Sequence, residues 1–168
     1  MTASASRFVP TTQARTRPDL AAVTVGTELP PLTVRLTRET LVRYAGASTD
    51  FNPIHFSDHF AQSLGLPGVI AHGMLTMGTA LRVVTDWIGD PARVRSWYAR
   101  FSRPVPVPDD ADGTEVTFTA RVTAIDDRSG DDKVATIGVE AVCGGERVLR
   151  GAVATVQLDG PKLPGTAQ

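Results

Sequence analysis

Residues 73–88 read GMLTMGTALRVVTDWI. Apolar side chains recur on most sides of this stretch at helical spacing, and Arg82 and Asp86 are its only charged residues. A helix that is apolar nearly all round is typical of the centre of a domain. Gly89-Asp90-Pro91 follows at once and predicts a firm end. We therefore expect a long, buried central helix over residues 73–88.

After Pro91 the apolar period changes from that of a helix to that of a strand. Turns rich in Asp and Gly separate the alternating runs. An earlier extended stretch, Gly26–Leu36, contains Pro30-Pro31, which favours a sheet edge. Together these segments predict an α+β fold, in which an antiparallel sheet wraps the central helix as in the hot-dog fold. The late predicted strands are 94–103, 114–125, 133–142 and 147–158.

Two shorter helices are predicted between the first strand and the central helix. Thr37 is placed to cap a helix that runs to about Ala45, with Gly46 as its stop. Ser57 is placed to cap a second helix over residues 58–64. The segment between these helices is a turn.

Length and composition predict one domain. The 168 residues suit a single unit, with 42% hydrophobic and 21% charged residues as in an average soluble protein. We expect a hot-dog domain over 21–159, a disordered tail over 1–20 and a loose tail over 160–168. Three arginines without an acid before Asp19 leave a transit peptide as the alternative for the first tail.

The same counts bear on partners and location. A net charge of −1 argues against nucleic acid, and no apolar run approaches the ~20 residues that span a bilayer. Cys143 is the single cysteine, which excludes an internal disulfide and fits a reducing compartment. We therefore expect a cytoplasmic protein that binds neither nucleic acid nor membrane.

The residues that carry chemistry lie just before the central helix. Asp50-Phe51-Asn52-Pro53-Ile54-His55 places a carboxylic acid and an imidazole on a proline-stiffened turn. His72-Gly73 follows, with the glycine where the helix begins. Helix N-termini present unpaired N–H groups and a positive dipole. An acid, a base and an oxyanion-binding amide suffice for adding or removing water beside a carbonyl.

Two runs of sequence also resemble a known family. Residues 44–55, YAGASTDFNPIH, and residues 70–77, IAHGMLTM, resemble the MaoC-like (R)-specific enoyl-thioester hydratases and dehydratases. The likeness is strongest to HadB, a subunit of the actinobacterial (3R)-hydroxyacyl-carrier-protein dehydratases. It extends through 83–91 and 100–105 and covers about 25–158.

The resemblance implies a role for each motif residue. Asp50 and His55 would be the catalytic acid/base pair, and which of them serves the carbon proton stays open. The Gly73 amide would bind the thioester oxygen. Asn52 and His72 are candidates for substrate binding, with a structural role in the turn as the alternative for both.

One position departs from part of the family. Some single-chain hydratases carry a serine on the central helix that bonds the catalytic carboxylate, and Leu81 stands at the matching position. HadB-like proteins also lack this serine. Thr76, Thr79 or Thr85 are possible replacements.

The implied function is reversible dehydration of (3R)-3-hydroxyacyl thioesters to trans-2-enoyl thioesters, on carrier-protein-bound chains in fatty-acid or polyketide-type elongation. The alternatives are an (R)-specific enoyl-CoA hydratase of degradation or polymer-precursor supply, a specialised-metabolism dehydratase, and a non-catalytic acyl-binding subunit. Partners would be acyl-ACP or acyl-CoA and a second hot-dog chain, in a homodimer or a heterodimer. We expect no cofactor and no metal, because the sequence has neither a phosphate-binding loop nor metal-ligand spacing.

Overall fold

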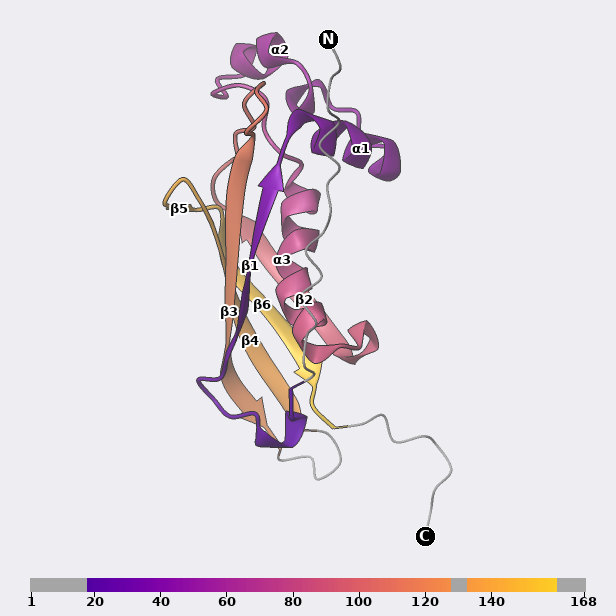
Figure 1. Cartoon of the computed structure of the whole chain (residues 1–168), viewed down its shortest axis with the longest axis vertical. Helices are drawn as coiled ribbons and strands as arrows, with labels where there is room; N and C mark the ends of the chain where they lie inside the picture. Colours follow the sequence, from indigo (N-terminus) through magenta and orange to yellow (C-terminus); the bar gives the residue numbers. More distant parts are fainter. Residues whose placement is uncertain (1–17, 128–132, 160–168) are drawn as a thin grey trace.

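The structure is a computed structural model that describes residues 18–127 and 133–159. In these residues six strands form one antiparallel sheet in the order β1-β3-β4-β6-β2, with β5 paired to β4 (Figure 1). The four late strands appear where the alternating periodicity predicts them. The bounds are β1 Glu28–Leu36, β2 Val94–Phe101, β3 Thr114–Asp126, β4 Val134–Cys143, β5 Glu146–Arg147 and β6 Leu149–Gln157.

The central helix α3 spans Gly73–Ile88, as predicted, and Gly89 ends it in a left-handed conformation. It lies along one face of the sheet and contacts β1, β2, β3, β4 and β6 (Figure 1). Its buried residues face the sheet, but Met74 is 60% exposed, so one side of the helix remains partly open. This arrangement is the predicted α+β hot-dog fold.

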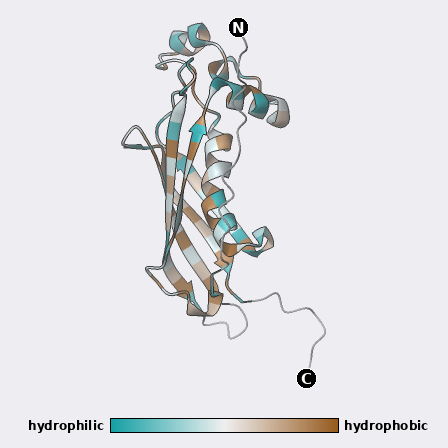
Figure 2. Ribbon diagram, in the orientation of Figure 1, coloured by the Kyte–Doolittle hydropathy of each residue, from teal (hydrophilic) through white to brown (hydrophobic). Residues whose placement is uncertain are grey.

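Buried and exposed side chains alternate along the strands, which gives the sheet an apolar inner face. Along β4 the residues with odd numbers from Ala135 to Cys143 are buried, and those between them are half-buried or exposed. Figure 2 shows the resulting bands of hydrophobic residues across the strands. A side-chain period of 2 places alternate residues on one face, which here packs against α3.

β1 lies at the edge of the sheet, as predicted. It pairs only with β3 in the described sheet, and its register shifts between Leu29 and Leu32. Pro30 and Pro31 lie inside that shift. Proline has no N–H to donate to a ladder, so a bulge on an edge strand accommodates the pair.

The helix α1 is longer than predicted. It spans Arg38–Ser48 with Thr37 as its N-cap, so the prediction that Gly46 ends it was wrong. Gly46 lies within the helix, and the left-handed residue is Thr49, at φ 60°. A β-branched residue with positive φ is a strained outlier. The strain falls immediately before Asp50.

Short elements complete the described chain. They are η1 Leu20–Ala22, η2 Pro53–His55, α2 Asp58–Ser63 and η3 Pro91–Arg93. Leu20, one residue before the expected boundary at residue 21, packs against the core. The rest of the two expected tails, 1–17 and 160–168, lies outside the described residues. No described helix is long and apolar enough to cross a membrane.

An ion pair ties together the segments that surround the motifs. Arg38 Nη2 of α1 donates to both carboxylate oxygens of Asp58 at 2.8 Å, and Arg38 Nε donates to the Val107 carbonyl at 2.6 Å. The Val69 N–H also donates to Asp58 Oδ1, at 2.9 Å. Hydrogen bonds between ionised groups are stronger than those between neutral groups. These contacts of Arg38 and Asp58 therefore connect α1, α2 and the loop before α3.

This ion pair predicts an acid dependence of stability. The hydrogen bond from Arg38 lowers the pKa of the Asp58 carboxyl below its ordinary value, helped by the Val69 amide. A carboxyl with a lowered folded-state pKa stabilises the fold above its unfolded pKa, about 3.9, and loses that contribution as pH falls through the folded value. Asp58→Asn should therefore flatten the decline of unfolding free energy below about pH 4. Denaturant titrations at a series of pH values measure this, and equal acid slopes in the two proteins would refute it.

Candidate active site

Asp50 is held by the turn that follows α1. Its backbone N–H donates to Ser48 Oγ at 3.3 Å, and its Oδ1 accepts the Asn52 N–H at 3.2 Å. Asn52 in turn accepts the Ile54 N–H at 3.2 Å and caps η2. The side chain of Asp50 remains 50% exposed. Local hydrogen bonds thus fix its position while leaving the carboxylate open to solvent.

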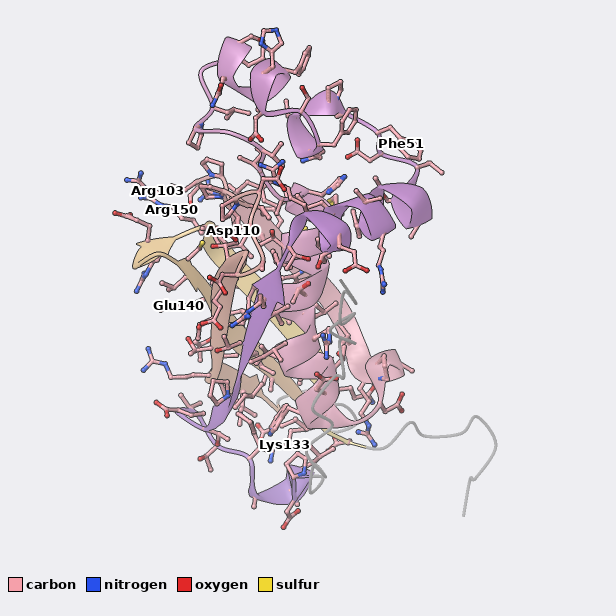
Figure 3. The ribbon with its side chains drawn as sticks, turned by 45° about the horizontal axis from the view of Figure 1, so that its top comes forward. Phe51, Arg103, Asp110, Lys133, Glu140 and Arg150 are labelled. Atoms are coloured by element: carbon pink, nitrogen blue, oxygen red, sulfur yellow. The ribbon has the colours of Figure 1, made fainter. Side chains whose placement is uncertain are left out.

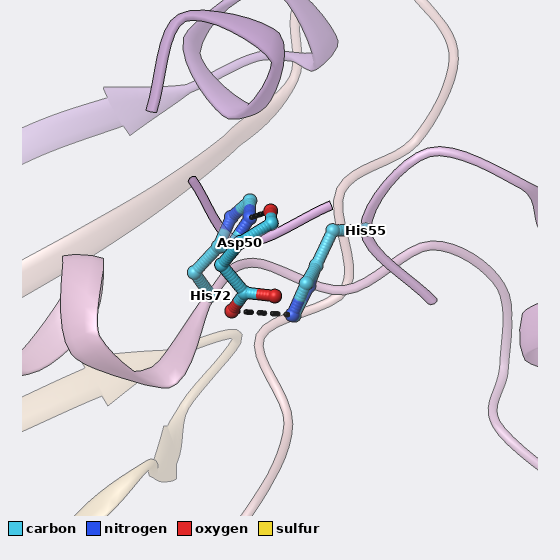
Figure 4. A group of neighbouring side chains, drawn as sticks. All are labelled: Asp50, His55 and His72. Atoms are coloured by element: carbon cyan, nitrogen blue, oxygen red, sulfur yellow. Dashed lines mark hydrogen bonds and ion pairs between the residues drawn. The ribbon is translucent and has the colours of Figure 1, made fainter. Parts of the chain in front are cut away.

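His55 lies at the end of η2 with its ring almost fully buried. Its Nδ1 is 2.8 Å from the Ile70 carbonyl oxygen. A carbonyl only accepts, so Nδ1 carries the proton and Nε2 of the neutral ring carries the lone pair. Nε2 lies 3.9 Å from Asp50 Oδ2 (Figure 4). The predicted acid/base pair is therefore brought together, with its reactive atoms facing each other.

The two reactive atoms are too far apart for a direct hydrogen bond. One oxygen atom can lie about 2.8 Å from both, because two distances of that length span the 3.9 Å between Nε2 and Oδ2. A water molecule or a substrate hydroxyl can therefore contact Asp50 and His55 at the same time.

Both groups open into one pocket of about 510 Å³. Most of its wall is apolar, and Gly73 lies in that wall at the first turn of α3. The first N–H groups of a helix have no partner inside it, so the Gly73 N–H has no acceptor within α3. The lining residues are Asp50, Ile54, His55, Ile70, Ala71, Gly73, Met74, Thr76, Phe101, Ser102, Arg103, Pro104, Val105 and Val148.

Phe101 is a site residue that sequence reasoning missed. Its ring comes from the end of β2 and would lie 3.1 Å from a Cβ at Gly73. A side chain at residue 73 would therefore crowd the Phe101 ring, which would have to move by a few tenths of an ångström. Phe101 lies in the predicted strand 94–103, but the sequence carries no signal that it contacts residue 73.

Asn52 and His72 do not line this pocket. Asn52 caps η2, as described above. His72 is 1% exposed, and its Nε2 donates to the backbone carbonyl of Asp50 at 3.1 Å. Burial lowers the pKa of His72 below its ordinary value, although the Asp50 carbonyl opposes the shift. Among the predicted site residues, these two support the turn and lie away from the pocket wall.

None of the three threonines on α3 is hydrogen-bonded to the Asp50 carboxylate. Thr76 and Thr79 donate to carbonyls one turn earlier in their own helix, at His72 and Leu75. Thr85 contacts the Arg82 carbonyl. The hydrogen bond that orients the Asp50 carboxylate comes from the backbone N–H of Asn52.

Asp50, His55 and His72 bring potential metal-ligand atoms within 4.8 Å of one another. The two imidazole rings are stacked, with centroids 3.7 Å apart and planes at 22°. Imidazole lone pairs lie in the ring plane, so nearly parallel stacked rings cannot converge on one ion at the usual ~2 Å. The geometry suits acid–base chemistry better than metal binding.

Comparison with known proteins identifies the family. The family model described as MaoC like domain matches residues 21–150. This chain belongs to the MaoC-like family. The MaoC-like match includes both motifs and most of the sheet, and it covers the expected domain almost completely.

Individual MaoC-like relatives agree with this assignment. The chain is 37% identical over 83 residues to 3-hydroxyacyl-thioester dehydratase X of Mycobacterium tuberculosis, covering 48% of this chain and 29% of that protein. It also matches fungal fatty acid synthase beta subunits, of whose length it spans only 5–6%.

Solved structures share the fold. A MaoC-like dehydratase superposes with a TM-score of 0.79 and 36% identity, over 85% of this chain and 43% of that one. The (R)-hydratase from A. caviae involved in PHA biosynthesis superposes with a TM-score of 0.68 and 25% identity, over 81% of this chain and 96% of that one. The predicted MaoC-like hot-dog fold is thus confirmed.

Proposed function

We propose that this MaoC-like protein interconverts (3R)-3-hydroxyacyl and trans-2-enoyl thioesters. The observation that carries the proposal is the facing pair of Asp50 and His55, 3.9 Å apart, in one pocket with the Gly73 amide. The names of the relatives, a 3-hydroxyacyl-thioester dehydratase and an (R)-hydratase, support the same chemistry.

In dehydration, the thioester oxygen accepts a hydrogen bond from the Gly73 N–H as negative charge develops on it. The Cα–H bond breaks and its proton passes to a base. The Cβ–O bond breaks and the departing hydroxyl takes a proton from an acid, leaving as water. One member of the pair thus gains a proton and the other loses one. A bridging water then transfers the proton back, which restores the starting state of both groups. Hydration is the reverse.

We assign the carbon proton to His55 and the oxygen to Asp50. His55 is 8% exposed and presents an unprotonated Nε2, whereas the Asp50 side chain is 50% exposed. Water enters and leaves from the solvent side, where Asp50 lies. This assignment puts the α-carbon toward the more buried side of the pocket, next to His55.

The pocket also favours an acyl substrate on a phosphate-bearing arm. Ile54, Ile70 and Val105 provide an apolar wall. Arg103 lines the opening and pairs with Glu146 at 3.1 Å. Figure 3 shows Arg103 and Arg150 at the side of the molecule that carries β5. These cations suit the phosphates of coenzyme A or of a carrier protein.

The most favoured setting is dehydration of carrier-protein-bound chains in fatty-acid or polyketide-type elongation. An (R)-specific enoyl-CoA hydratase is the alternative that the A. caviae relative supports. A purely acyl-binding subunit has no need for both Asp50 and His55, so the intact pair argues against that role.

The test is whether the purified chain hydrates crotonyl-coenzyme A to (3R)-3-hydroxybutyryl-coenzyme A, followed by loss of the enoyl absorbance and chiral analysis of the product. The same acyl group on a carrier protein and on pantetheine measures the contribution of the carrier. We expect the (R)-product from at least one thioester. Exclusive (S)-product, or no turnover of any of the three with or without a second hot-dog chain, would refute the proposal.

We further propose that the chain works as a dimer of hot dogs, either with itself or with a related chain. β2 is an edge of the described sheet and exposes Tyr98 and Phe101, and Met74 lies exposed at the start of α3. Unpaired edges and exposed apolar side chains invite pairing with another chain.

Light scattering should therefore give twice the mass of the chain at micromolar concentration. Tyr98→Lys, on the exposed edge strand, should shift the mass toward the monomer. A chain that is fully active as a monomer would contradict the prediction. Activity that appears only after a second hot-dog chain is added would identify the heterodimer.

A further inference from the structure

Three rings from three separate elements pack together behind the acid/base pair. His72, the N-cap of α3, stacks on His55 of η2 with centroids 3.7 Å apart and planes at 22°. Tyr44 of α1 packs edge-on against the same His72 ring, with centroids 4.8 Å apart and planes at 60°. Figure 4 shows the His72 ring beside Asp50 and His55. His72 therefore contacts both members of the pair, one through its ring and the other through a hydrogen bond.

The hydrogen bonds assign opposite tautomers to the two histidines. His55 donates from Nδ1 to Ile70, whereas His72 donates from Nε2 to the Asp50 carbonyl. His72 Nδ1 is buried and has no hydrogen-bond partner among the described residues. Adding a proton there would bury an unpaired donor on a cation, which is strongly unfavourable.

A neutral His72 also suits the chemistry on its neighbour. When His55 holds the substrate proton, its ring is a cation 3.7 Å from the His72 ring. A second cation in the same stack would oppose that proton transfer. The titratable side chains around His72 are His55 and Tyr44, with the carboxylate of Asp50 nearby. None of them provides an acceptor for a proton on Nδ1.

We propose that His72 is a positioning residue that acts through both catalytic groups: its neutral ring sets the plane of His55, and its Nε2–H sets the backbone of Asp50. It does not touch the substrate. The inference rests on the proposed function, because it concerns how the same acid/base pair is aligned. Small misplacements of catalytic groups lower rates steeply, so the effect appears in kcat.

Two substitutions separate the two contacts. His72→Phe keeps a ring for stacking but loses the donor to Asp50. His72→Gln keeps an N–H near the position of Nε2 but loses the ring. His59→Gln, at an exposed histidine on α2, is the matched control. Each variant is assayed on the thioester that the wild-type enzyme turns over best, with rates normalised to the folded fraction.

Each His72 variant should lower kcat by about 10-fold or more with KM changed by less than about threefold, and the control should match the wild type. The decisive comparison repeats His72→Gln in a His55→Ala background. Because His72 acts partly through His55, its effect on the residual rate should be smaller there than in the wild-type background. Nitrogen-15 NMR of the wild-type enzyme should show the Nε2–H tautomer for His72.

Three results would overturn the inference. They are a kcat within twofold of wild type in both variants, an undiminished effect of His72→Gln in the His55→Ala background, or an Nδ1–H tautomer at His72. A purely structural role would lower the melting temperature and leave the kcat of the folded enzyme unchanged. These outcomes leave the proposed function standing, which fails if the wild-type enzyme converts no thioester or gives only the (S)-product.

Discussion

Asp50→Asn and His55→Asn should each lower kcat on the best thioester by at least about 100-fold. The amide at position 50 keeps the size of the carboxylate but cannot exchange the hydroxyl proton. At position 55, the asparagine N–H mimics Nδ1 and keeps a donor for the Ile70 carbonyl while removing the basic Nε2. Both substitutions therefore remove the chemistry and preserve the local contacts. Initial rates across a pH series measure the loss.

Circular dichroism and melting temperature provide the control for these two variants, which should remain folded. Because the two groups act as one acid/base pair, the double variant should be scarcely slower than the worse single one. If both single variants retain near-normal kcat, the pair is not the catalytic centre. Independent, multiplicative losses would mean that the two groups do not act as one unit.

Gly73→Ala should lower kcat/KM by about 10- to 100-fold. The new methyl group would lie 3.1 Å from two ring atoms of Phe101, closer than most real contacts allow. Either the ring moves into the pocket or the first turn of α3 shifts. The first response blocks access of the thioester oxygen to the amide and the second moves the amide, and oxyanion contacts depend strongly on geometry. Steady-state kinetics on the same thioester measures the change.

The compensating variant Gly73→Ala/Phe101→Leu separates the two causes. A smaller side chain at 101 relieves the contact, so the double variant should recover part of the lost activity. Phe101→Leu alone is the matched control for loss of the aromatic wall. A Gly73→Ala enzyme as active as the wild type would show that the Gly73 amide does not need close access to the substrate.

Local sequence patterns predicted most of the secondary structure. The bounds of α3 follow from helical periodicity ending at Gly89, whose left-handed conformation costs glycine little. The late strands follow from alternation, which encodes which side chains face the core. The Asp50 and His55 pair was predictable because its members lie on one short turn. These features depend on neighbours in the chain.

The misplaced end of α1 shows where local signals fail. Gly46 has a glycine's freedom to end a helix, but the helix continues to Ser48, and Thr49 adopts the left-handed conformation instead. We infer that the contacts of the following turn outweigh the local preference. Asp50 is bonded to Ser48 and Asn52, and His72 bonds its carbonyl from another element.

The finer chemistry of the site arises from contacts between segments that are distant in the chain. The Ile70 carbonyl selects the tautomer of His55, the stacked His72 supports its ring, and Phe101 of β2 closes over Gly73. Periodicity and motif spacing carry no information about such pairs. They form only when the sheet brings β2 beside β6 and packs α3 against both. The residue types of the site can therefore be identified from the sequence, whereas their protonation and alignment depend on tertiary packing.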